Sequence, residues 1–184
     1  MSAVQNVARI DGPNLVLRLV TPEDAAYLHR LRTDPRYNQH LSAVSGSAED
    51  QRLWIVAYKA REAEGRELYY IIERHDGTRC GTVRLYDITA NSFTWGSWIL
   101  DDNKPAKAAL ASALLVYEVG FERLGCTGSV FDVRHDNTRT LAFHRRFGAR
   151  EIGADARDIY FDYTRDRFAA DRGQLEQALG QGAF

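Results

Sequence analysis

The chain lacks several features that would place it in a specialised class of proteins. It has no excess of charge of one sign, since 24 Lys and Arg oppose 25 Asp and Glu and leave a formal net charge of −1. General attraction to nucleic acid or to anionic membranes is therefore not expected. Only two cysteines occur, Cys80 and Cys126, and neither has a metal-binding spacing. We expect no metal site and two reduced, buried thiols.

The sequence also has no long apolar run and no repeat, and we expect no signal peptide. No run approaches the length of a transmembrane helix, and Met1–Asn6 lacks the basic start and apolar stretch of a signal peptide. There is no internal repeat and no Pro/Ser-rich linker. At 184 residues, the chain is long enough for one substantial core. We therefore expect a single domain over residues 1–184 that is soluble and cytoplasmic.

Strand and helix patterns follow one another along the chain. The alternating leucines of Asn14–Val20 predict a first strand. Helix starts are predicted at Thr21-Pro22-Glu23-Asp24 and at Ser47-Ala-Glu-Asp50, with a polar loop between the two helices. Further strands are predicted at 68–73, 81–86, 93–100, 129–134, 149–152 and 158–163. A long helix precedes residue 125, another follows Asn137, and residues 165–184 form a partly helical tail.

Four motifs between Phe93 and Ala149 carry a resemblance to a known family. They are Trp95-Gly96, Gly120-Phe-Glu-Arg-Leu-Gly125, Asp136-Asn137-x-Arg139 and Phe143-His144-x-x-Phe147-Gly148-Ala149. With the order of elements, they resemble the GNAT superfamily of N-acetyltransferases, closest to the branch that acetylates ribosomal-protein N-termini and amino sugars. The resemblance implies an α/β (α+β) fold with a mixed, mostly antiparallel sheet of about seven strands and about four helices. It also implies a homodimer as one possible assembly, since dimers are common in the family.

Strands four and five are splayed in this family, and the gap holds an acyl-coenzyme A. Acetyl-CoA or another short acyl-CoA is therefore the expected substrate, with no metal. Unpaired backbone groups of strand four, at Trp98, Ile99 and Leu100, would bind the pantetheine arm as a false strand. The pyrophosphate then falls at the N-terminus of the next helix, where free N–H groups and the dipole favour negative charge. Asn137 and Arg139 are expected to add contacts from the helix after strand five.

The phosphate loop departs from the family pattern at one position. The family has Gln/Arg-x-x-Gly-x-Gly/Ala, and this chain has Lys104-Pro105-Ala106-Lys107-Ala108-Ala109. Lys107 replaces a glycine whose role is to let backbone approach phosphate. In one interpretation the lysine adds charge and the site is modified; in the other the loop is degraded and coenzyme A binds weakly or not at all. Pro105 favours an ordered helix start and so a modified site.

The sequence identifies the catalytic acid and base less clearly than it identifies the coenzyme A site. His144 occupies the position of a tyrosine that protonates the departing thiolate in many family members, and histidine can serve as an acid or a base. A basic, solvated helix face would carry such a histidine as well. The usual strand-four glutamate is replaced by Thr94, so a base must come from elsewhere. The candidates are Asp132, Asp87, His40 and a water relay. Asn137 is expected to cap its helix while it helps to hold the pantetheine.

Acceptor residues form a second group. Arg84 and Tyr86 share one face of a predicted strand, and they offer a fork for phosphate and a ring for stacking. His40 and Trp95 complete the candidates. The segment Arg84-Leu-Tyr86-Asp87 resembles sugar N-acyltransferases of surface-polysaccharide pathways, which acylate the amine of a nucleotide-linked deoxyamino sugar. The other segments that carry this resemblance are Trp54-Ile-Val-Ala-Tyr58, Glu67-x-Tyr69-Tyr70, Phe93-x-Trp95-Gly-Ser-Trp98 and Phe131-Asp-Val-Arg134. The alternatives are a protein N-terminal acetyltransferase and a catalytically silent module that binds coenzyme A or nothing.

Overall fold

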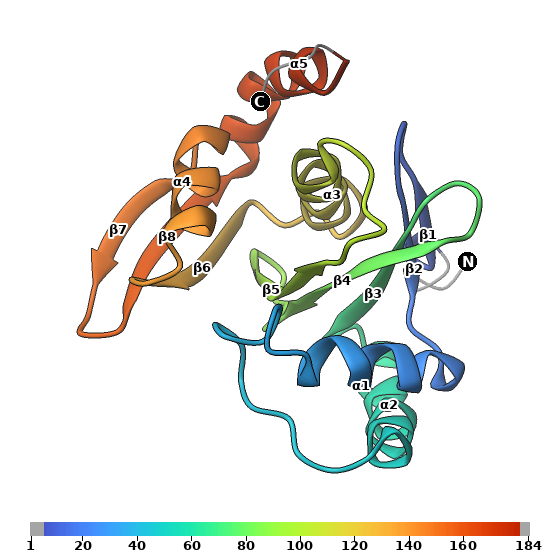
Figure 1. The fold of residues 1–184 in the computed structure, drawn as a ribbon. Coiled ribbons are helices and arrows are strands. Elements are labelled where there is room, and N and C mark those ends of the chain that lie inside the picture. The colour runs from blue at the N-terminus through green and yellow to red at the C-terminus, as the bar shows by residue number, and fades with distance from the viewer. Residues whose placement is uncertain (1–5, 181–184) are drawn as a thin grey trace.

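A computed structural model describes residues 6–180 and shows a single mixed sheet with helices on both faces (Figure 1). The strands are β1 (Arg9–Asp11), β2 (Val16–Leu19), β3 (Leu68–Glu73), β4 (Arg79–Tyr86), β5 (Ser92–Leu100), β6 (Gly128–Arg134), β7 (Arg150–Ala154) and β8 (Asp158–Thr164). Their order in the sheet is β1-β2-β3-β4-β5-β6-β8-β7, and only the β5–β6 pair is parallel. The predicted α/β fold is confirmed, with one strand more. The sequence does not reveal β1 because three residues are too few to show alternation.

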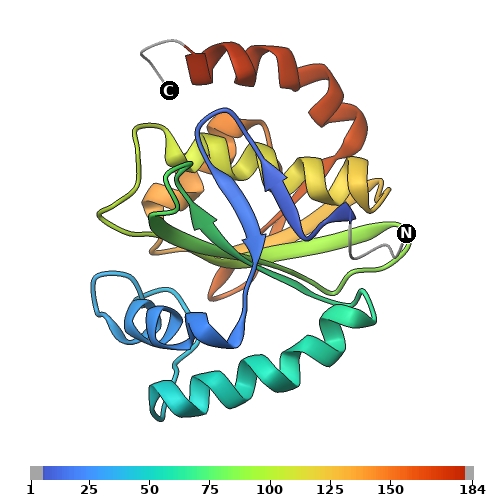
Figure 2. The ribbon, with the colours of Figure 1, turned by 90° about the vertical axis from the view of Figure 1, so that its right-hand side faces the viewer.

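Helices lie on both sides of this sheet (Figure 2). They are η2 (Pro22–Asp24), α1 (Ala25–Thr33), α2 (Ala48–Ala63), α3 (Ala108–Tyr117), the π-helical η3 (Glu118–Arg123), α4 (Thr138–Phe147) and α5 (Arg165–Gly180). Figure 2 shows α1 and α2 on one side, and α3 and α5 on the other. The tail is more ordered than expected, since α5 runs unbroken through Gly173. Residues 181–184 of the predicted tail lie outside the described residues. None of the described helices has both the length and the apolar character needed to cross a membrane.

Two cores hold these layers together. Leu28, Ile55, Tyr58 and Ile71 are fully buried in the core beneath α1 and α2. The larger core lies beneath α3 and α4 and is rich in aromatic rings, with Phe93, Tyr117, Phe147, Phe161 and Tyr163 among its buried members. Cys80 and Cys126 are buried and free, as the sequence predicts. Burial of apolar area at about 25 cal/mol per Å² makes these cores the main source of stability.

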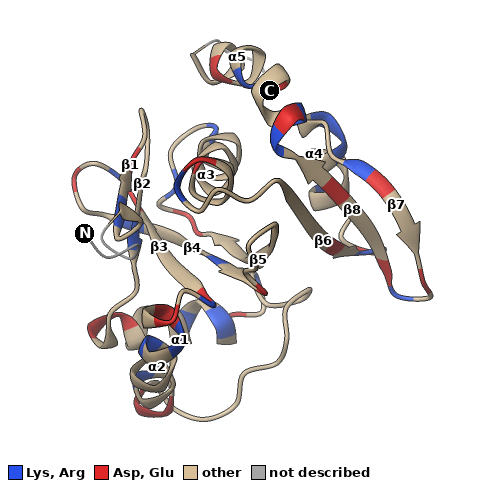
Figure 3. Ribbon diagram, turned by 180° about the vertical axis from the view of Figure 1, so that it is seen from behind, with Lys and Arg blue, Asp and Glu red and all other residues tan. Residues whose placement is uncertain are grey.

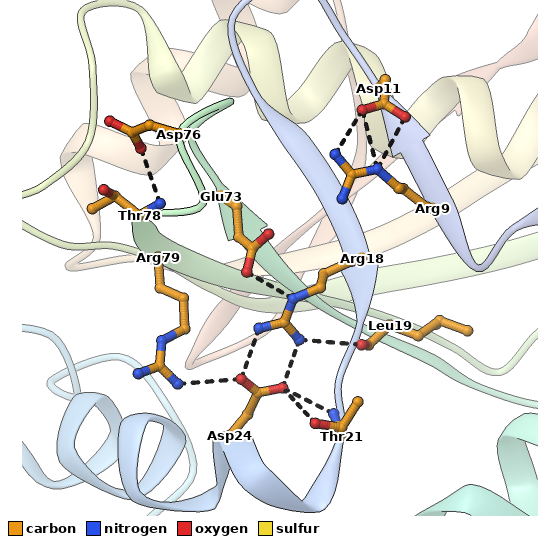
Figure 4. Close-up of polar contacts among 10 residues, drawn as sticks. All are labelled: Arg9, Asp11, Arg18, Leu19, Thr21, Asp24, Glu73, Asp76, Thr78 and Arg79. Atoms are coloured by element: carbon orange, nitrogen blue, oxygen red, sulfur yellow. Dashed lines mark hydrogen bonds and ion pairs between the residues drawn. The ribbon is translucent and has the colours of Figure 1, made fainter.

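A cluster of four charged residues fastens the start of α1 to three strands (Figure 4). Asp24 is 2% exposed and accepts two hydrogen bonds from Arg18, at 2.7 and 2.8 Å. Arg79 donates to the same carboxylate at 3.2 Å, and Arg18 also donates to Glu73 at 2.7 Å. Burial opposes ionisation of Asp24, but the hydrogen bonds from Arg18 and from the Thr21 backbone outweigh it and lower the pKa. The cluster therefore joins β2, β3 and β4 to the helix layer through one ionised aspartate.

Candidate active site

The sheet opens between β5 and β6. These strands pair only at Ser92 with Gly128 and at Phe93 with Ser129. Beyond Phe93 they diverge, and a cavity of about 1080 Å³ lies in the opening, lined in part by Trp98, Ile99 and Leu100. Figure 1 shows β6 turning away from β5 beside α3. The edge of β5 that faces β6 thus has no strand partner here, which is the arrangement that a peptide-like arm can complete.

A bulge in β5 shapes one wall of the cavity. The register of β4 and β5 shifts after Thr82, and Ser97 adopts a left-handed conformation with φ of 48°. Thr82 Oγ1 donates to the Ser97 carbonyl at 3.2 Å. A Cβ atom on Gly81 would lie 2.2 Å from the Ile99 carbonyl oxygen, so the close strand approach requires glycine. The bulge changes the direction of the Trp98 side chain, whose Nε1 donates to Ser112 Oγ on α3 at 3.1 Å.

The phosphate loop is formed, and its lysine has an unusual conformation. All six residues from 104 to 109 line the cavity. Lys107 is the N-cap of α3 and is left-handed, with φ of 58° and ψ of 21°. Glycine adopts this conformation freely, whereas another residue is destabilised by roughly 1–2 kcal/mol. The chain therefore keeps a backbone conformation suited to glycine although it carries a lysine.

The ammonium of Lys107 bonds outside the loop. Its Nζ donates to the carbonyl oxygens of Ala178 and Leu179 in α5, at 2.5 and 3.2 Å. Lys104 is directed to its own turn, where Nζ donates to the Asp101 carbonyl at 3.3 Å. The ammonium of Lys107 is thus bonded to the end of α5. Neither of the two interpretations of the loop anticipates this contact.

His144 lies in a cage of aromatic rings. Its own ring is 3% exposed, and five aromatic rings have centroids within 4.4–6.2 Å of it, those of Phe131, Trp95, Phe143, Phe161 and Trp98. Burial lowers the pKa of His144 to about 3. Its Nδ1 is buried without a hydrogen-bond partner among residues 6–180. At neutral pH the ring is therefore a neutral imidazole. It has one N–H that can donate a hydrogen bond, and it lacks the second proton of an imidazolium.

Two carboxylates and a phenol line another part of the cavity. Phe131 and Val133 point into the core as predicted, and Asp132 between them lies on the opposite, exposed face of β6. Although the residue is exposed, partial desolvation of its carboxylate and then the charge of Asp158 raise the pKa of Asp132. Asp158 on β8 has one oxygen, Oδ1, buried without a partner in the described part of the chain. The cavity wall thus holds two neighbouring carboxylates.

Tyr86 reaches this part of the cavity from β4. A Cβ atom on Gly96 would lie 3.3 Å from the Tyr86 hydroxyl, so the ring lies over the Trp95-Gly96 segment of β5. Burial, and then the charge of Asp132, raise the pKa of Tyr86. The phenol therefore stays protonated and can donate to an acceptor molecule that enters the opening.

The family follows from comparison with known sequences and structures. The family model described as an acetyltransferase (GNAT) domain matches residues 14–150. The chain belongs to this GNAT family. No curated protein matches the sequence.

Solved GNAT structures share the fold over almost their whole length. A structure described as apo FdhC, a nucleotide-linked sugar GNAT, is 40% identical, with a TM-score of 0.85 over 92% of this chain and 97% of that chain. Mycobacterium smegmatis RimJ in complex with CoA-disulfide is 20% identical, with a TM-score of 0.78 over 94% and 95%. Spermidine N-acetyltransferase from Vibrio cholerae, with CoA and spermine, is 15% identical, with a TM-score of 0.74 over 86% and 99%. The last two show the fold alone.

The opening of this GNAT domain brings together most of the residues predicted from the sequence. The residues that line it include Trp98, Ile99, Leu100, Lys104, Lys107, Ala108, Ala109, Asn137, Arg139, His144, Asp132, His40, Tyr86 and Trp95. Asn137 caps α4 as expected, since its Oδ1 accepts from the Thr140 backbone at 3.3 Å. Trp95 is only 4% exposed, and its Nε1 donates to Tyr117, so its ring is largely a core group. His40 lies 3.3 Å from Asp136 through Nδ1 and Oδ1.

Two of the candidates, Arg84 and Asp87, do not line the opening. The Nη2 atom of Arg84 donates to Glu67 at 2.6 Å, and its guanidinium lies 5.3 Å from the ring centroid of Tyr86. The charge of Arg84 is therefore paired with a carboxylate, and its contact with the site runs through Tyr86. Among residues 6–180, no group of three or more His, Cys, Asp or Glu side chains is arranged to hold a metal ion.

Two residues of the site escape sequence reasoning. Asp101 is 2% exposed and accepts from Tyr27 Oη at 2.9 Å and from the Asn103 backbone at 2.8 Å, which anchors the start of the phosphate loop. The Asp-x-Asn turn pattern is a signal that could have found it. Asp158 has no such signal, because its place beside Asp132 depends on the register of β6 and β8.

Proposed function

We propose that this acetyltransferase moves an acyl group from a coenzyme A thioester to the primary amine of a nucleotide-linked deoxyamino sugar. The observation that carries the acceptor class is the 40% identity to a nucleotide-linked sugar GNAT over 92% of the chain. The ribosomal-protein-type and polyamine enzymes that share the fold are only 15–20% identical. A sugar acceptor is thus favoured over a peptide or a polyamine.

Charge around the opening supports a ligand rich in phosphate. Apart from Lys107, whose ammonium is bonded to α5, six of the lining residues are basic, and they are Arg36, Lys104, Arg134, Arg139, Arg146 and Arg157. Three are acidic, and they are Asp102, Asp132 and Asp158. Figure 3 shows Lys and Arg on the loop before α3 and along α4. Coenzyme A and a nucleotide-linked sugar both carry phosphates, whereas a basic peptide would favour an acidic cleft.

Each part of the opening has a role in the proposed transfer. The free edge of β5 binds the pantetheine arm, and the start of α3 binds the pyrophosphate. A backbone N–H near Trp98 polarises the thioester carbonyl, where the negative charge of the transition state develops. This arrangement leaves the part of the opening lined by Tyr86 and Asp132 for the amine.

Proton movement completes the reaction. Asp132 takes one proton from the ammonium group, which leaves a neutral amine to attack the thioester carbon. A second proton from that nitrogen goes to the departing sulfur, so that an amide and a free thiol result. His144 is neutral and surrounded by aromatic rings, and we assign it the role of donating a hydrogen bond to the sulfur. Burial disfavours the imidazolium, so His144 does not deliver the proton that the thiolate receives.

Release of free thiol from acetyl-CoA tests this proposal directly. The purified chain should release thiol with thymidine- or uridine-diphosphate-linked deoxyamino sugars, and the product should be the N-acetylated sugar nucleotide by mass. The same sugars already N-acetylated serve as the control, since they lack a free amine. Turnover on N-terminal peptides or on spermidine but not on the sugars would overturn the acceptor assignment. No turnover on any amine, with longer acyl chains also tried, would favour a silent coenzyme A-binding module.

A further inference from the structure

Lys107 belongs at once to the phosphate loop and to the end of α5. Its backbone caps α3, where its carbonyl accepts from the Ala111 N–H at 2.9 Å. Its side chain spans to the last turn of α5, where Nζ bonds to the carbonyls of Ala178 and Leu179. These two positions are 71 and 72 residues further along the chain. A change in the conformation of the loop at Lys107 would therefore alter the hydrogen bonds at the end of α5, and a change at the end of α5 would alter those of Lys107.

The end of α5 needs the cation that Lys107 supplies. The last carbonyls of a helix have no partner within it and carry partial negative charge. A helix often meets this need with a Lys or Arg in its own last turn, and α5 has none there. Packing brings the loop within reach, since Phe168 and Leu175 of α5 are buried and Ala178 and Leu179 pack against the same core as α3.

The loop in turn needs something to hold Lys107 in its left-handed conformation. No side-chain hydrogen bond caps the start of α3, and the residue is not a glycine. The two bonds to α5 are the polar contacts that the structure gives its side chain. They hold the ammonium at α5, while residues 107–109 line the opening.

We propose that Lys107 is a positioning residue through which α5 holds the phosphate loop in its coenzyme A-binding conformation. The lysine acts by fixing backbone and does not act as a charge on the phosphates. Coenzyme A and the folded last turn of α5 then favour each other, since coupling between two sites is reciprocal. The inference rests on coenzyme A binding and is independent of the acceptor amine.

Two substitutions separate backbone positioning from direct charge. Lys107→Met removes the ammonium but leaves a residue that resists the left-handed conformation. Lys107→Gly removes the same ammonium and adopts that conformation freely. By calorimetry with coenzyme A alone, we expect Lys107→Met to bind about five- to tenfold more weakly and Lys107→Gly to bind within about twofold of the parent chain. Equal losses in both variants would show that the charge acts on the ligand and would overturn the proposal.

Hydrogen exchange of the amides at residues 174–180 supplies a readout besides affinity. In the parent chain, saturating coenzyme A should slow exchange in this last turn, and both Lys107 variants should exchange faster and lose the response to ligand. Lys104→Met is the matched control, because its Nζ bonds to Asp101 and not to α5. It should keep the response of α5 whatever its affinity. Exchange in α5 that ignores ligand in the parent chain would overturn the coupling.

Failure of this inference is distinguishable from failure of the proposed acceptor. Both measurements use coenzyme A without an amine, so a wrong acceptor leaves them unchanged. Absence of coenzyme A binding in the parent chain would overturn the positioning role. Faster exchange at the end of α5 in the free Lys107→Met variant would then show that the lysine serves only α5.

Discussion

The two parts of the sheet are built differently. Strands β2 to β5 pair along their length, with α1 and α2 on one side and α3 on the other (Figure 2). Strands β6 and β8 bury one face against the larger core, whereas all five residues of the outermost strand β7 are exposed. Val130 and Ile152, which are 44% and 48% exposed, lie in these strands. The opening that holds the candidate site lies at the boundary between the two parts.

The pKa values of two aspartates, Asp24 and Asp132, differ between the two parts of the sheet. Asp24 in the first part is buried, but its arginine partners outweigh the cost of burial and lower its pKa. For Asp132 in the second part, partial desolvation together with the charge of Asp158 outweighs the charges of Arg157 and Arg134 and raises the pKa. A partnered carboxylate serves as a structural anchor, whereas a carboxylate beside another carboxylate is a better proton acceptor. The first part thus acts as a scaffold, and the second contributes reactive groups to the site.

The largest effect should come from breaking the anchor. Asp24→Asn leaves Arg18 and Arg79 without their shared carboxylate, and removal of one partner from a buried pair costs about 3–5 kcal/mol. Denaturant unfolding measures this loss in the free energy of unfolding. Asp11→Asn is the control, since Asp11 and Arg9 form an exposed pair and such pairs contribute about 0–1 kcal/mol. Equal losses in the two variants would contradict the distinction between scaffold and surface.

The anchor also has a pH signature. Because the pKa of Asp24 is lowered on folding, its contribution is fully present above the unfolded value of about 3.9 and is lost as pH falls through the folded value. The parent chain should therefore lose part of its stability below about pH 4, and Asp24→Asn should lose less over the same range.

The next effect concerns the proton acceptor. Asp132→Asn keeps the shape of the side chain and removes the proposed base, and loss of a positioned base lowers kcat/KM by about 100-fold or more. Asp87→Asn is a matched control at another aspartate that the sequence offers as a base. Asp87 is left-handed with φ of 50°, a conformation that asparagine tolerates, and it does not line the opening. Steady-state kinetics should show little change there. A larger loss for Asp87→Asn would move the base to that residue.

A smaller effect is expected at the caged histidine. His144→Phe keeps an aromatic ring among the others and removes the N–H, so the proposed hydrogen bond to the sulfur is lost. Such a bond contributes about 1 kcal/mol, which corresponds to about fivefold in kcat. Unchanged kcat in this variant would reduce His144 to a packing residue.

His144 should also make the free energy of unfolding depend on pH. Its pKa is lowered to about 3 on folding, so the unfolded chain binds a proton that the folded chain does not between about pH 3 and 6.5. The free energy of unfolding of the parent chain should therefore fall as pH falls through this range. His144→Phe should remove that slope.

Sequence reasoning reached the fold and the opening because both depend on local signals. The helix start at Ser47 is an example, since the Asp50 carboxylate accepts a hydrogen bond from the Ser47 backbone N–H at 2.7 Å. The splayed strands and the loop from Lys104 to Ala109 follow from motif order in the same way.

Long-range contacts lay beyond the reach of the sequence. The cage that keeps His144 neutral draws rings from β5, β6, β8 and α4, and the bond from Lys107 to α5 crosses more than 70 residues. The pairing of Arg84 with Glu67 likewise depends on the register of β3 against β4. Protonation states and bond partners in this site are set by such contacts, which no motif encodes.

The smallest and most specific effect concerns the neighbour of the proposed base. Asp158→Asn removes a negative charge near Asp132, so the pKa of Asp132 should fall and the acid limb of the pH profile of kcat/KM should move to lower pH. Asp162→Asn is the control on the same strand, where the side chain pairs with Arg150 at 2.5 Å and does not line the opening. It should leave the limb in place. A shift to higher pH, or the same shift in both variants, would show that Asp158 does not act through Asp132. A shift in Asp158→Asn alone would tie the raised pKa of Asp132 to the charge of Asp158, which acts against the opposing charges of Arg157 and Arg134.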